Sequence, residues 1–261
     1  MMQQNRPLIL VSNDDSVDSP GFHHLINCVK EFGDVIGVAP ASPQSGQSSA
    51  ISVNVPLYIT EVKQYSTAET PIYKVNGTPV DCVKLALHTI VNRRPSLILA
   101  GINHGSNSGV NVIYSGTMGA VLEGCLVGIP SVGFSVLDHS WATDLNGTTD
   151  TVKRITSAVL SHGLPEGICL NVNIPAECMP KGIKLTRSAH GFWTEEYAEY
   201  HTPNGQPFYW LTGRFNNSEP DNPETDEYWL SRGWSTVVPT ATDMTDKLAF
   251  TNIKNLLNLD D

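Results

Sequence analysis

The stretch LILVSNDDSVDSPGF (residues 8–22) places an unbroken apolar run directly before two adjacent acids, Asp14 and Asp15. A short apolar run bounded by polar residues is typical of a strand that is buried on both faces. Pro20 lies in the same stretch and suits the first position of a helix, which we expect to run to about Glu31. The stretch therefore predicts a buried strand, a polar loop and a helix, as in the opening unit of a parallel sheet.

The same alternation of apolar strands and helical segments continues to about residue 175. Strands are expected at residues 8–12, 34–39, 51–59, 96–100, 130–135 and 168–174, and helices at residues 20–31, 79–91, 116–128 and 150–161. Thr78 is expected to cap the helix that opens with Pro79. Strands that alternate with helices at these spacings predict an α/β fold, a parallel sheet covered by helices on both faces.

Length and composition narrow the class of protein. The chain has 261 residues, of which 40% are hydrophobic, and a net charge of -10. This suits a single domain with a substantial core, and the acidity disfavours binding to a nucleic-acid polymer. We find no signal sequence or membrane span, and we therefore expect a cytoplasmic protein. The five cysteines lack a CxxC pattern and are expected to be buried reduced thiols: Cys28, Cys82, Cys125, Cys169 and Cys178.

The character of the sequence changes after Pro175, within what we treat as one domain of residues 1–261. Residues 1–175 would form the α/β core with the active site, and residues 176–261 an extension for subunit contacts. Residues 185–214 read as a long hairpin with TPNGQP at its centre, followed by a terminal helix from about Thr245 that Asp243 and Asp246 cap. Four tryptophans of the extension are expected to pack in an interface rather than stack on a base: Trp193, Trp210, Trp229 and Trp234.

Asn13, Asp14 and Asp15 follow the first expected strand, at the edge where ligands bind an open parallel sheet. Neighbouring carboxylates repel each other unless a cation lies between them. Oxygen ligands alone favour Mg²⁺, Mn²⁺ or Ca²⁺ over zinc. The same three residues also have good turn chemistry and could cap the next helix. Taken alone, the stretch leaves a cation site and a plain turn open.

Two further loops are expected at the same edge of the sheet. APASPQSGQSSA (residues 39–50) follows the second strand and is rich in hydroxyls, and GINHGSNSGVNVIYSGTMGA (residues 101–120) follows the strand at 96–100. The second loop leads into a helix start, whose N–H groups and dipole favour a phosphate. It is neither a Walker loop nor a dinucleotide fingerprint. Together the three loops predict a site for a divalent cation and a phosphate.

Four stretches, in this order, resemble motifs of the survival protein E (SurE) family of nucleotidases: LVSNDDSVDSPG, VAPASPQSGQSSAIS, NGTPVDCVKLAL and AGINHGSNSGVNVIYSGTMGAVLEG. The resemblance continues at PSVGFS, LNVNIP and GQPFYWLTG and covers most of the chain. It implies a Rossmann-like, three-layer α/β/α core with a C-terminal hairpin and helix used in oligomerisation. It also implies 5′-nucleotidase activity: metal-dependent removal of phosphate from nucleoside 5′- and 3′-monophosphates, and in some members from short polyphosphate.

The resemblance also implies roles for particular residues. The metal ligands would be Asp14, Asp15, Ser45 and Asn103, and one of the two acids would orient the attacking water or accept its proton. The residues near the substrate would be Asn13, Asn107, Ser115, Gly116 and Thr117. Ser16 is a departure, because the family usually has glycine there; a positive φ at this position would strain a serine.

The implied cofactor is one divalent cation per subunit, Mg²⁺ or Mn²⁺, with Ca²⁺ able to replace it in a crystal. The implied partners are a nucleoside monophosphate substrate and further copies of the chain, as a homodimer or homotetramer. Neither a nucleic-acid polymer nor a membrane is expected as a partner.

Two other classes also place acids after the first strand. A haloacid-dehalogenase-type phosphatase works through an aspartyl-phosphate, but it needs Asp-x-Asp, which residues 13–16 do not provide. A non-catalytic receiver or nucleotide-sensing module is shorter than 261 residues unless an output domain is attached, and none is evident. Metal-dependent phosphate release separates the enzymes from the sensor, and a trapped phosphoaspartate separates the two enzymes.

Overall fold

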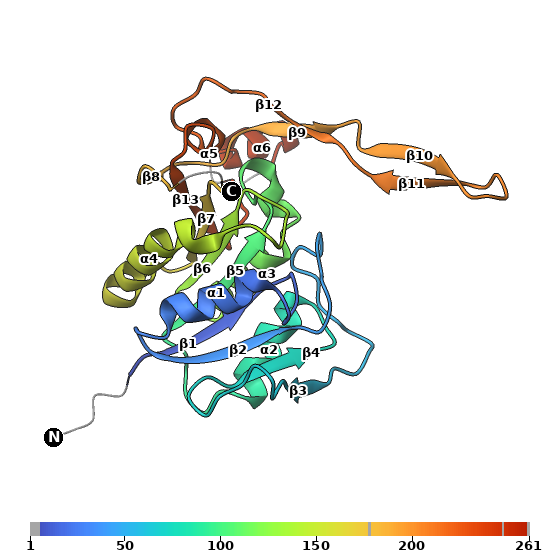
Figure 1. Cartoon of the computed structure of the whole chain (residues 1–261). Helices are drawn as coiled ribbons and strands as arrows, with labels where there is room; N and C mark the ends of the chain where they lie inside the picture. Colours follow the sequence, from blue (N-terminus) through green and yellow to red (C-terminus); the bar gives the residue numbers. More distant parts are fainter. Residues whose placement is uncertain (1–5, 177–178, 247, 260–261) are drawn as a thin grey trace.

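The computed structural model describes residues 6–176, 179–246 and 248–259 of the chain. A parallel sheet lies at its centre (Figure 1). Its parallel strands are β1 (Leu8–Ser12), β2 (Asp34–Pro40), β4 (Ile72–Val75), β5 (Leu97–His104), β6 (Ser131–Val136) and β7 (Ile168–Ile174). Three further strands complete it: the short edge strands β3 (Ile59–Glu61) and β8 (Ile183–Leu185), and β13 (Ser235–Ala241) between β7 and β8. The order in the described residues is β3-β4-β2-β1-β5-β6-β7-β13-β8, with β3 and β13 antiparallel to their neighbours β4 and β7.

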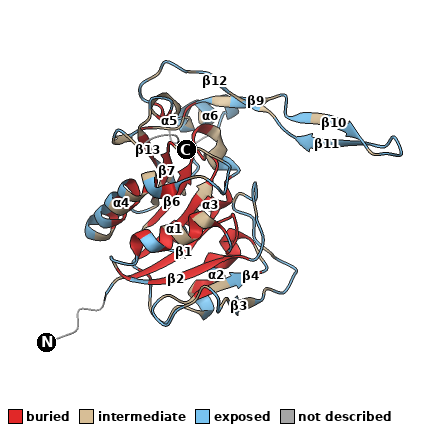
Figure 2. Ribbon diagram, viewed as in Figure 1, coloured by how far each residue is buried: buried red, intermediate tan, exposed pale blue. Residues whose placement is uncertain are grey.

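Helices cover both faces of the sheet and make a three-layer molecule (Figure 1). One face carries α1 (Pro20–Val29) and α4 (Thr149–His162), and the other carries α2 (Pro79–Thr89) and α3 (Gly116–Leu126). The apolar residues fall into two clusters, one on each side of the sheet: Phe22 and Val152 belong to the first, Val83 and Met118 to the second. Figure 2 shows the central strands, such as β1 and β6, buried between these layers. The α/β class predicted from the sequence is confirmed.

Most expected elements appear close to their expected bounds, and α2 has the expected start. Thr78 accepts a hydrogen bond from the N–H of Asp81, and the Asp81 side chain accepts one from the N–H of Thr78. This reciprocal pair satisfies N–H groups that a helix start leaves free. Pro79 occupies the first turn, where its missing N–H costs nothing.

The strand expected at residues 51–59 is wrong over most of its length, because only Ile59 enters β3. Ile51, Val53 and Val55 are exposed, and Ser52 is tied to Asp81 at the start of α2 by two hydrogen bonds. Period-two alternation produces a strand only where a neighbouring strand can pair with it. Here β4 already occupies the position beside β2.

The terminal helix α6 (Phe250–Leu257) begins later than the expected Thr245. The Asp246 carboxylate accepts hydrogen bonds from the N–H groups of Leu248 and Ala249, which precede the helix. Ala249 holds the N-cap position without a side-chain cap bond, so the predicted capping of α6 by Asp243 and Asp246 is wrong. The sequence analysis did not anticipate β4, β13 or the short helix α5 (Asp226–Leu230).

The expected hairpin projects from the body of the molecule (Figure 1). Its root is the pair β9 (Gly191–Thr194) and β12 (Arg214–Asn217), and its tip is the pair β10 (Tyr197–His201) and β11 (Pro207–Leu211). The residues after 176 are not all an appendage, since β8 and β13 complete the central sheet. The hairpin therefore lies between two strands of the central sheet, β8 before it and β13 after it, which attach it to the core.

Four of the five cysteines are free and buried, as predicted: Cys28, Cys82, Cys125 and Cys169. Cys178 lies outside the described residues. None of the helices in the described ranges is both long and apolar enough to cross a membrane.

The strand order of the sheet reverses between β1 and β5. From β1 the chain adds β2 on one side and, after α2, adds β5 on the other side. The carboxyl ends of β1 and β5 therefore open a crevice between them, which is where open α/β sheets bind ligands. The loop after β1 carries the two adjacent acids.

Candidate active site

Asp14 and Asp15 lie at this crevice and are almost completely buried, with 4% and 7% of their surface exposed. The main-chain oxygen of Asp14 accepts a hydrogen bond of 2.7 Å from the N–H of Gln44, in the loop after β2. Oδ2 of Asp15 accepts a 2.8 Å bond from the N–H of His104, at the end of β5. These two bonds join the loops that follow β1, β2 and β5, as the sequence predicted.

Burial makes the two carboxylates costly to ionise. It raises the pKa of Asp14 to about 6, with repulsion from Asp15 as the next cause, although hydrogen bonds from Thr117 act in the opposite direction. Burial also raises the pKa of Asp15, against the hydrogen bond from the N–H of His104. A cation beside both carboxylates would offset this desolvation and repulsion.

The start of α3 packs directly behind Asp14. The Ser115 side chain accepts a 3.0 Å bond from the N–H of Met118 and so caps the helix. Thr117 donates its hydroxyl to Oδ1 of Asp14. A Cβ at Gly116 would lie only 3.0 Å from Oδ2 of Asp14, so the close approach requires glycine. The helix N-terminus thus supports the acid that faces the cavity.

Asn103 and Ser45 supply further oxygen atoms at the same edge. The Asn103 side-chain amide donates a 2.7 Å bond to the main-chain oxygen of Gly105, which leaves its Oδ1 available to a ligand. Ser45 is exposed and lines the cavity from the loop after β2. Among the described residues, no three His, Cys, Asp or Glu side chains gather around one point. A cation here would therefore depend on amide and hydroxyl oxygens as well as on two carboxylates, a donor set that suits a hard ion.

Asn107 sits in a buried amide network below the cavity. Its N–H donates to Oδ1 of Asn173, and its side-chain amide donates to Oγ of Ser135. Its main-chain oxygen accepts from the side-chain amide of Asn171. Buried polar groups that are fully paired define a single loop conformation. The network therefore fixes the loop after β5 relative to β6 and β7.

A cavity of about 730 Å³ opens at this edge. Five of the residues implicated by the sequence line it: Asp14, Ser45, Asn103, Asn107 and Ser115. The other four lie outside its lining: Asn13, Asp15, Gly116 and Thr117. The Asn13 amide donates to the main-chain oxygen of Ser16, so in this structure Asn13 shapes the acidic loop.

Ser16 has φ of 89°, in the region that favours glycine. The strain foreseen for a serine at this position is therefore present. The loop after β1 nevertheless keeps both acids at the crevice.

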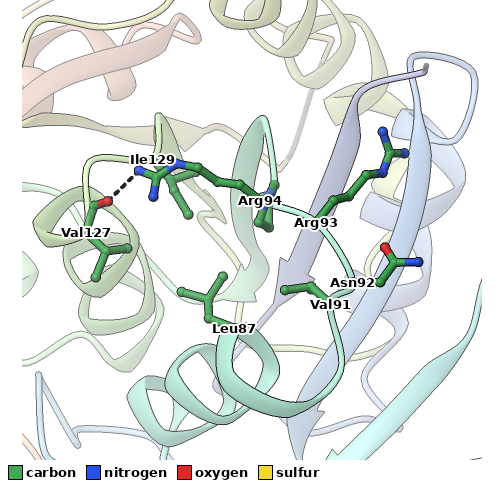
Figure 3. Close-up of a pocket in the computed structure, with 8 residues that line it drawn as sticks. Leu87, Val91, Asn92, Arg93, Arg94, Val127 and Ile129 are labelled. Atoms are coloured by element: carbon green, nitrogen blue, oxygen red, sulfur yellow. Dashed lines mark hydrogen bonds between the residues drawn. The ribbon is translucent and has the colours of Figure 1, made fainter. Parts of the chain in front are cut away.

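A second cavity, of about 440 Å³, lies at the opposite edge of the sheet (Figure 3). It is lined by the end of α2 and by the loops that precede β5 and β6, that is, at the amino ends of the strands. Its two arginines are already engaged: Arg94 donates to the main-chain oxygen of Val127, and Arg93 donates to Asp34. The candidate catalytic and ligand-binding side chains therefore lie at the carboxyl ends of the strands, around Asp14.

Comparison with known proteins identifies the family. The family model described as Survival protein SurE matches residues 9–195, which is more than half of the chain. The chain belongs to the SurE family. The acidic loop, the strands β2 to β7 and the first strand of the hairpin root, β9, lie within the matched residues. The SurE resemblance drawn from the motifs is confirmed.

Individual SurE proteins match over almost the whole chain. A protein of Phocaeicola vulgatus named 5′-nucleotidase SurE is 45% identical, with 97% of this chain and 98% of that protein covered. One of Christiangramia forsetii with the same name is 47% identical, with 94% of each covered. The crystal structure of the SurE protein from Aquifex aeolicus superposes with a TM-score of 0.82 at 34% identity, covering 96% of this chain and 100% of that one.

The structure adds cavity residues that the sequence analysis of this SurE chain did not identify. His139 follows β6, so the rule that located the other loops could have found it. Trp193, Tyr197 and Phe215 come from the hairpin, and no local signal connects them to the acids. His104, left without a role from the sequence, also lines the cavity and is buried; its ring nitrogens have no hydrogen-bond partner among the described residues.

Proposed function

We propose that this SurE chain hydrolyses phosphomonoesters and acts on nucleoside 5′- and 3′-monophosphates with the help of a divalent cation. Short polyphosphate is a further expected substrate. One observation carries the proposal: Asp14 and Asp15 are adjacent, buried carboxylates at the strand-order reversal of a parallel sheet. The names of the related proteins, 5′-nucleotidase SurE, support the substrate class.

The proposed cation ligands are Asp14, Asp15, Ser45 and Asn103. All four offer oxygen, as Mg²⁺ and Mn²⁺ prefer. When bound, the cation supplies positive charge to the phosphoryl oxygens. The preferred ion is the one that supports the faster release of phosphate when Mn²⁺ and Mg²⁺ are compared.

The chain's own residues then have distinct tasks. Asp14 faces the cavity with a pKa of about 6, so at pH 7–8 it is mostly ionised and can orient a water molecule or accept its proton. The water oxygen attacks phosphorus, the bond to the ribose oxygen breaks, and that oxygen takes up a proton. Ser115 at the start of α3 lies where the transferred phosphoryl group would sit.

The test is phosphate release from a panel of nucleoside 5′- and 3′-monophosphates, short polyphosphate and an aryl phosphate, with Mn²⁺, with Mg²⁺ and with EDTA. Release that needs a metal and favours nucleotides is the expected result. The same assay in H₂¹⁸O, with a search for a trapped phosphoaspartate, distinguishes direct water attack from an aspartyl-phosphate route. No release with either metal would contradict the proposal and favour a sensing role.

Asp15→Asn tests the assignment of the site, because the amide keeps the shape but removes the charge. We expect turnover to fall by roughly 10²-fold or more, the range seen when positioned acid–base groups are lost. Asp221→Asn is the matched control, since Asp221 is an exposed acid outside the cavity lining. Near-normal turnover of Asp15→Asn would refute the assignment.

We also propose that copies of the chain associate through the extension, as a homodimer or homotetramer. Aromatic side chains of the hairpin tip are left in solvent, with Tyr209 59% and Trp210 64% exposed, and Figure 2 shows little burial along this arm. On α6, Phe250 and Leu256 are exposed as well. Apolar surface of this extent is typical of an interaction site.

Sedimentation velocity at micromolar concentration tests the association. A species at two or four times the monomer mass of 28.4 kDa is expected. Trp210→Glu should shift it toward the monomer, and a wild-type chain that stays monomeric would contradict the proposal. The cytoplasmic location remains a prediction, which the four free buried thiols support because reduced thiols persist there.

A further inference from the structure

The cavity above Asp14 has two chemically different walls. The wall on the sheet edge is polar and includes Asp14, Asn103 and Ser115. The other wall comes from the hairpin, where the root meets the tip pair, and is largely aromatic and aliphatic: Trp193, Tyr197, Leu211 and Phe215, with Glu196 and Thr212 between them. A ligand that fills the cavity therefore meets charge at one end and ring faces at the other.

The Trp193 side chain is held in one orientation by a hydrogen bond and by ring packing. Its indole N–H donates a 3.0 Å hydrogen bond to Oδ1 of Asn111, in the segment that links β5 to α3. Across the β9–β12 pair it lies opposite Phe215, with ring centroids 6.2 Å apart. The Phe215 ring in turn packs on Gly109, where an added Cβ would approach it to 3.1 Å. These contacts order the indole before any ligand arrives, which reduces the entropy cost of binding.

The sequence analysis expected Trp193 to pack in an interface, but the structure places it in the cavity lining. We infer that Trp193 is instead the platform on which the base of the nucleotide stacks. The inference rests on the proposed function and adds to it the group that distinguishes a nucleotide from other phosphate esters. A nucleoside monophosphate is itself two-ended, with an anionic phosphate and an aromatic base joined by the ribose. With the phosphate at the Asp14 end, the base lies toward the hairpin root.

The type of contact determines the expected selectivity. Stacking on an indole uses the π-face that every base has, so it tolerates purines and pyrimidines alike. An ester without a base, such as ribose 5-phosphate, gains nothing from it. Trp193 should therefore set the preference for nucleotides over sugar phosphates, and should discriminate only weakly between one base and another.

The experiment compares kcat/KM for AMP, UMP and ribose 5-phosphate in four proteins with Mn²⁺: wild type, Trp193→Ala, Trp193→Phe and Trp141→Ala. Trp193→Ala should lower kcat/KM for both nucleotides by roughly tenfold or more, in line with the loss of one base–aromatic stack. Ribose 5-phosphate should change by less than about twofold, and Trp193→Phe should recover most of the loss. Trp141 is the matched control, since it is an exposed tryptophan and is not part of the cavity lining among the described residues.

A parallel loss for ribose 5-phosphate in Trp193→Ala would overturn the inference, because it would mean that Trp193 only supports the fold of the site. Unchanged kcat/KM for AMP would overturn it as well. Calorimetric titration of AMP and ribose 5-phosphate with the same four proteins gives a second readout that needs no turnover. If wild type releases no phosphate, the proposed function fails, whereas selective loss of AMP affinity in Trp193→Ala would still support the platform.

Discussion

The hydroxyl of Thr117 donates a hydrogen bond to Oδ1 of Asp14, across 103 positions of the chain. Asp14 lies at the start of the loop after β1, and Thr117 lies in the first turn of α3. The bond stabilises the ionised carboxylate, because it lowers a pKa that burial raises. The start of α3 thus stabilises the charged form of Asp14.

Replacing Thr117 by Val removes this donor and keeps the side-chain volume. The pKa of Asp14 should then rise above about 6, since the Thr117 hydroxyl lowers it. The acid limb of the profile of kcat/KM against pH should move to higher pH, with a larger loss of activity at pH 6 than at pH 8. Thr117→Ser keeps a hydroxyl and should leave the limb in place. An unmoved limb in Thr117→Val would show that Asp14 does not control it.

Asp14→Asn should stabilise the metal-free protein at high pH. The folded-state pKa of about 6 lies above the ordinary aspartate value of 3.8, so the protonated form favours folding. That contribution is complete below pH 4 and is lost as the pH rises through 6, a difference on the order of 2–3 kcal/mol. The amide stays neutral and avoids the loss.

Urea unfolding in EDTA checks this linkage. We expect Asp14→Asn to exceed wild type in unfolding free energy at pH 8 and to match it near pH 4. The control Asp221→Asn changes an exposed carboxylate and should give no such pH-dependent gain. Equal differences at both pH values would mean that titration of Asp14 is not the cause.

Adding Mn²⁺ to the EDTA-stripped protein should raise its Tm, because binding to the folded state alone stabilises it. At a hundred times the Kd the gain is about 2.7 kcal/mol, which for a chain of this size is roughly 5–10 °C. The shift should shrink at pH 5, where the cation must displace the proton from Asp14. Differential scanning calorimetry measures it, and an undiminished shift in Asp15→Asn would place the ion elsewhere.

Ser16→Gly should stabilise the protein modestly. Serine at φ of 89° is strained, and glycine relieves the strain while gaining some freedom in the unfolded chain, for a net gain of about 0.5–1 kcal/mol. Ser16→Ala keeps the strain and removes only the hydroxyl, so it should show no gain. Urea unfolding of wild type and the two variants measures the difference in unfolding free energy. Equal stability of the glycine and alanine variants would show that strain at this φ does not destabilise the protein.

Much of the site could be predicted because it is built from strand ends. Asp14, Ser45 and Asn103 each follow a strand that the apolar runs identify, and parallel strands bring their carboxyl ends to one edge. The same rule extends to His139 after β6. The prediction failed where pairing depends on distant neighbours, as in residues 51–58, where alternation met no partner strand.

The sequence by itself determined the parallel α/β core, the acidic loop and the capped helices, because these depend on local periodicity and on the chemistry of helix ends. Only the tertiary structure decided that Thr117 would support Asp14 and that Trp193 would line the same cavity as Asp14. The reason is physical: those contacts join residues far apart in the chain, and the packing of the hairpin root on the loop after β5 brings them together.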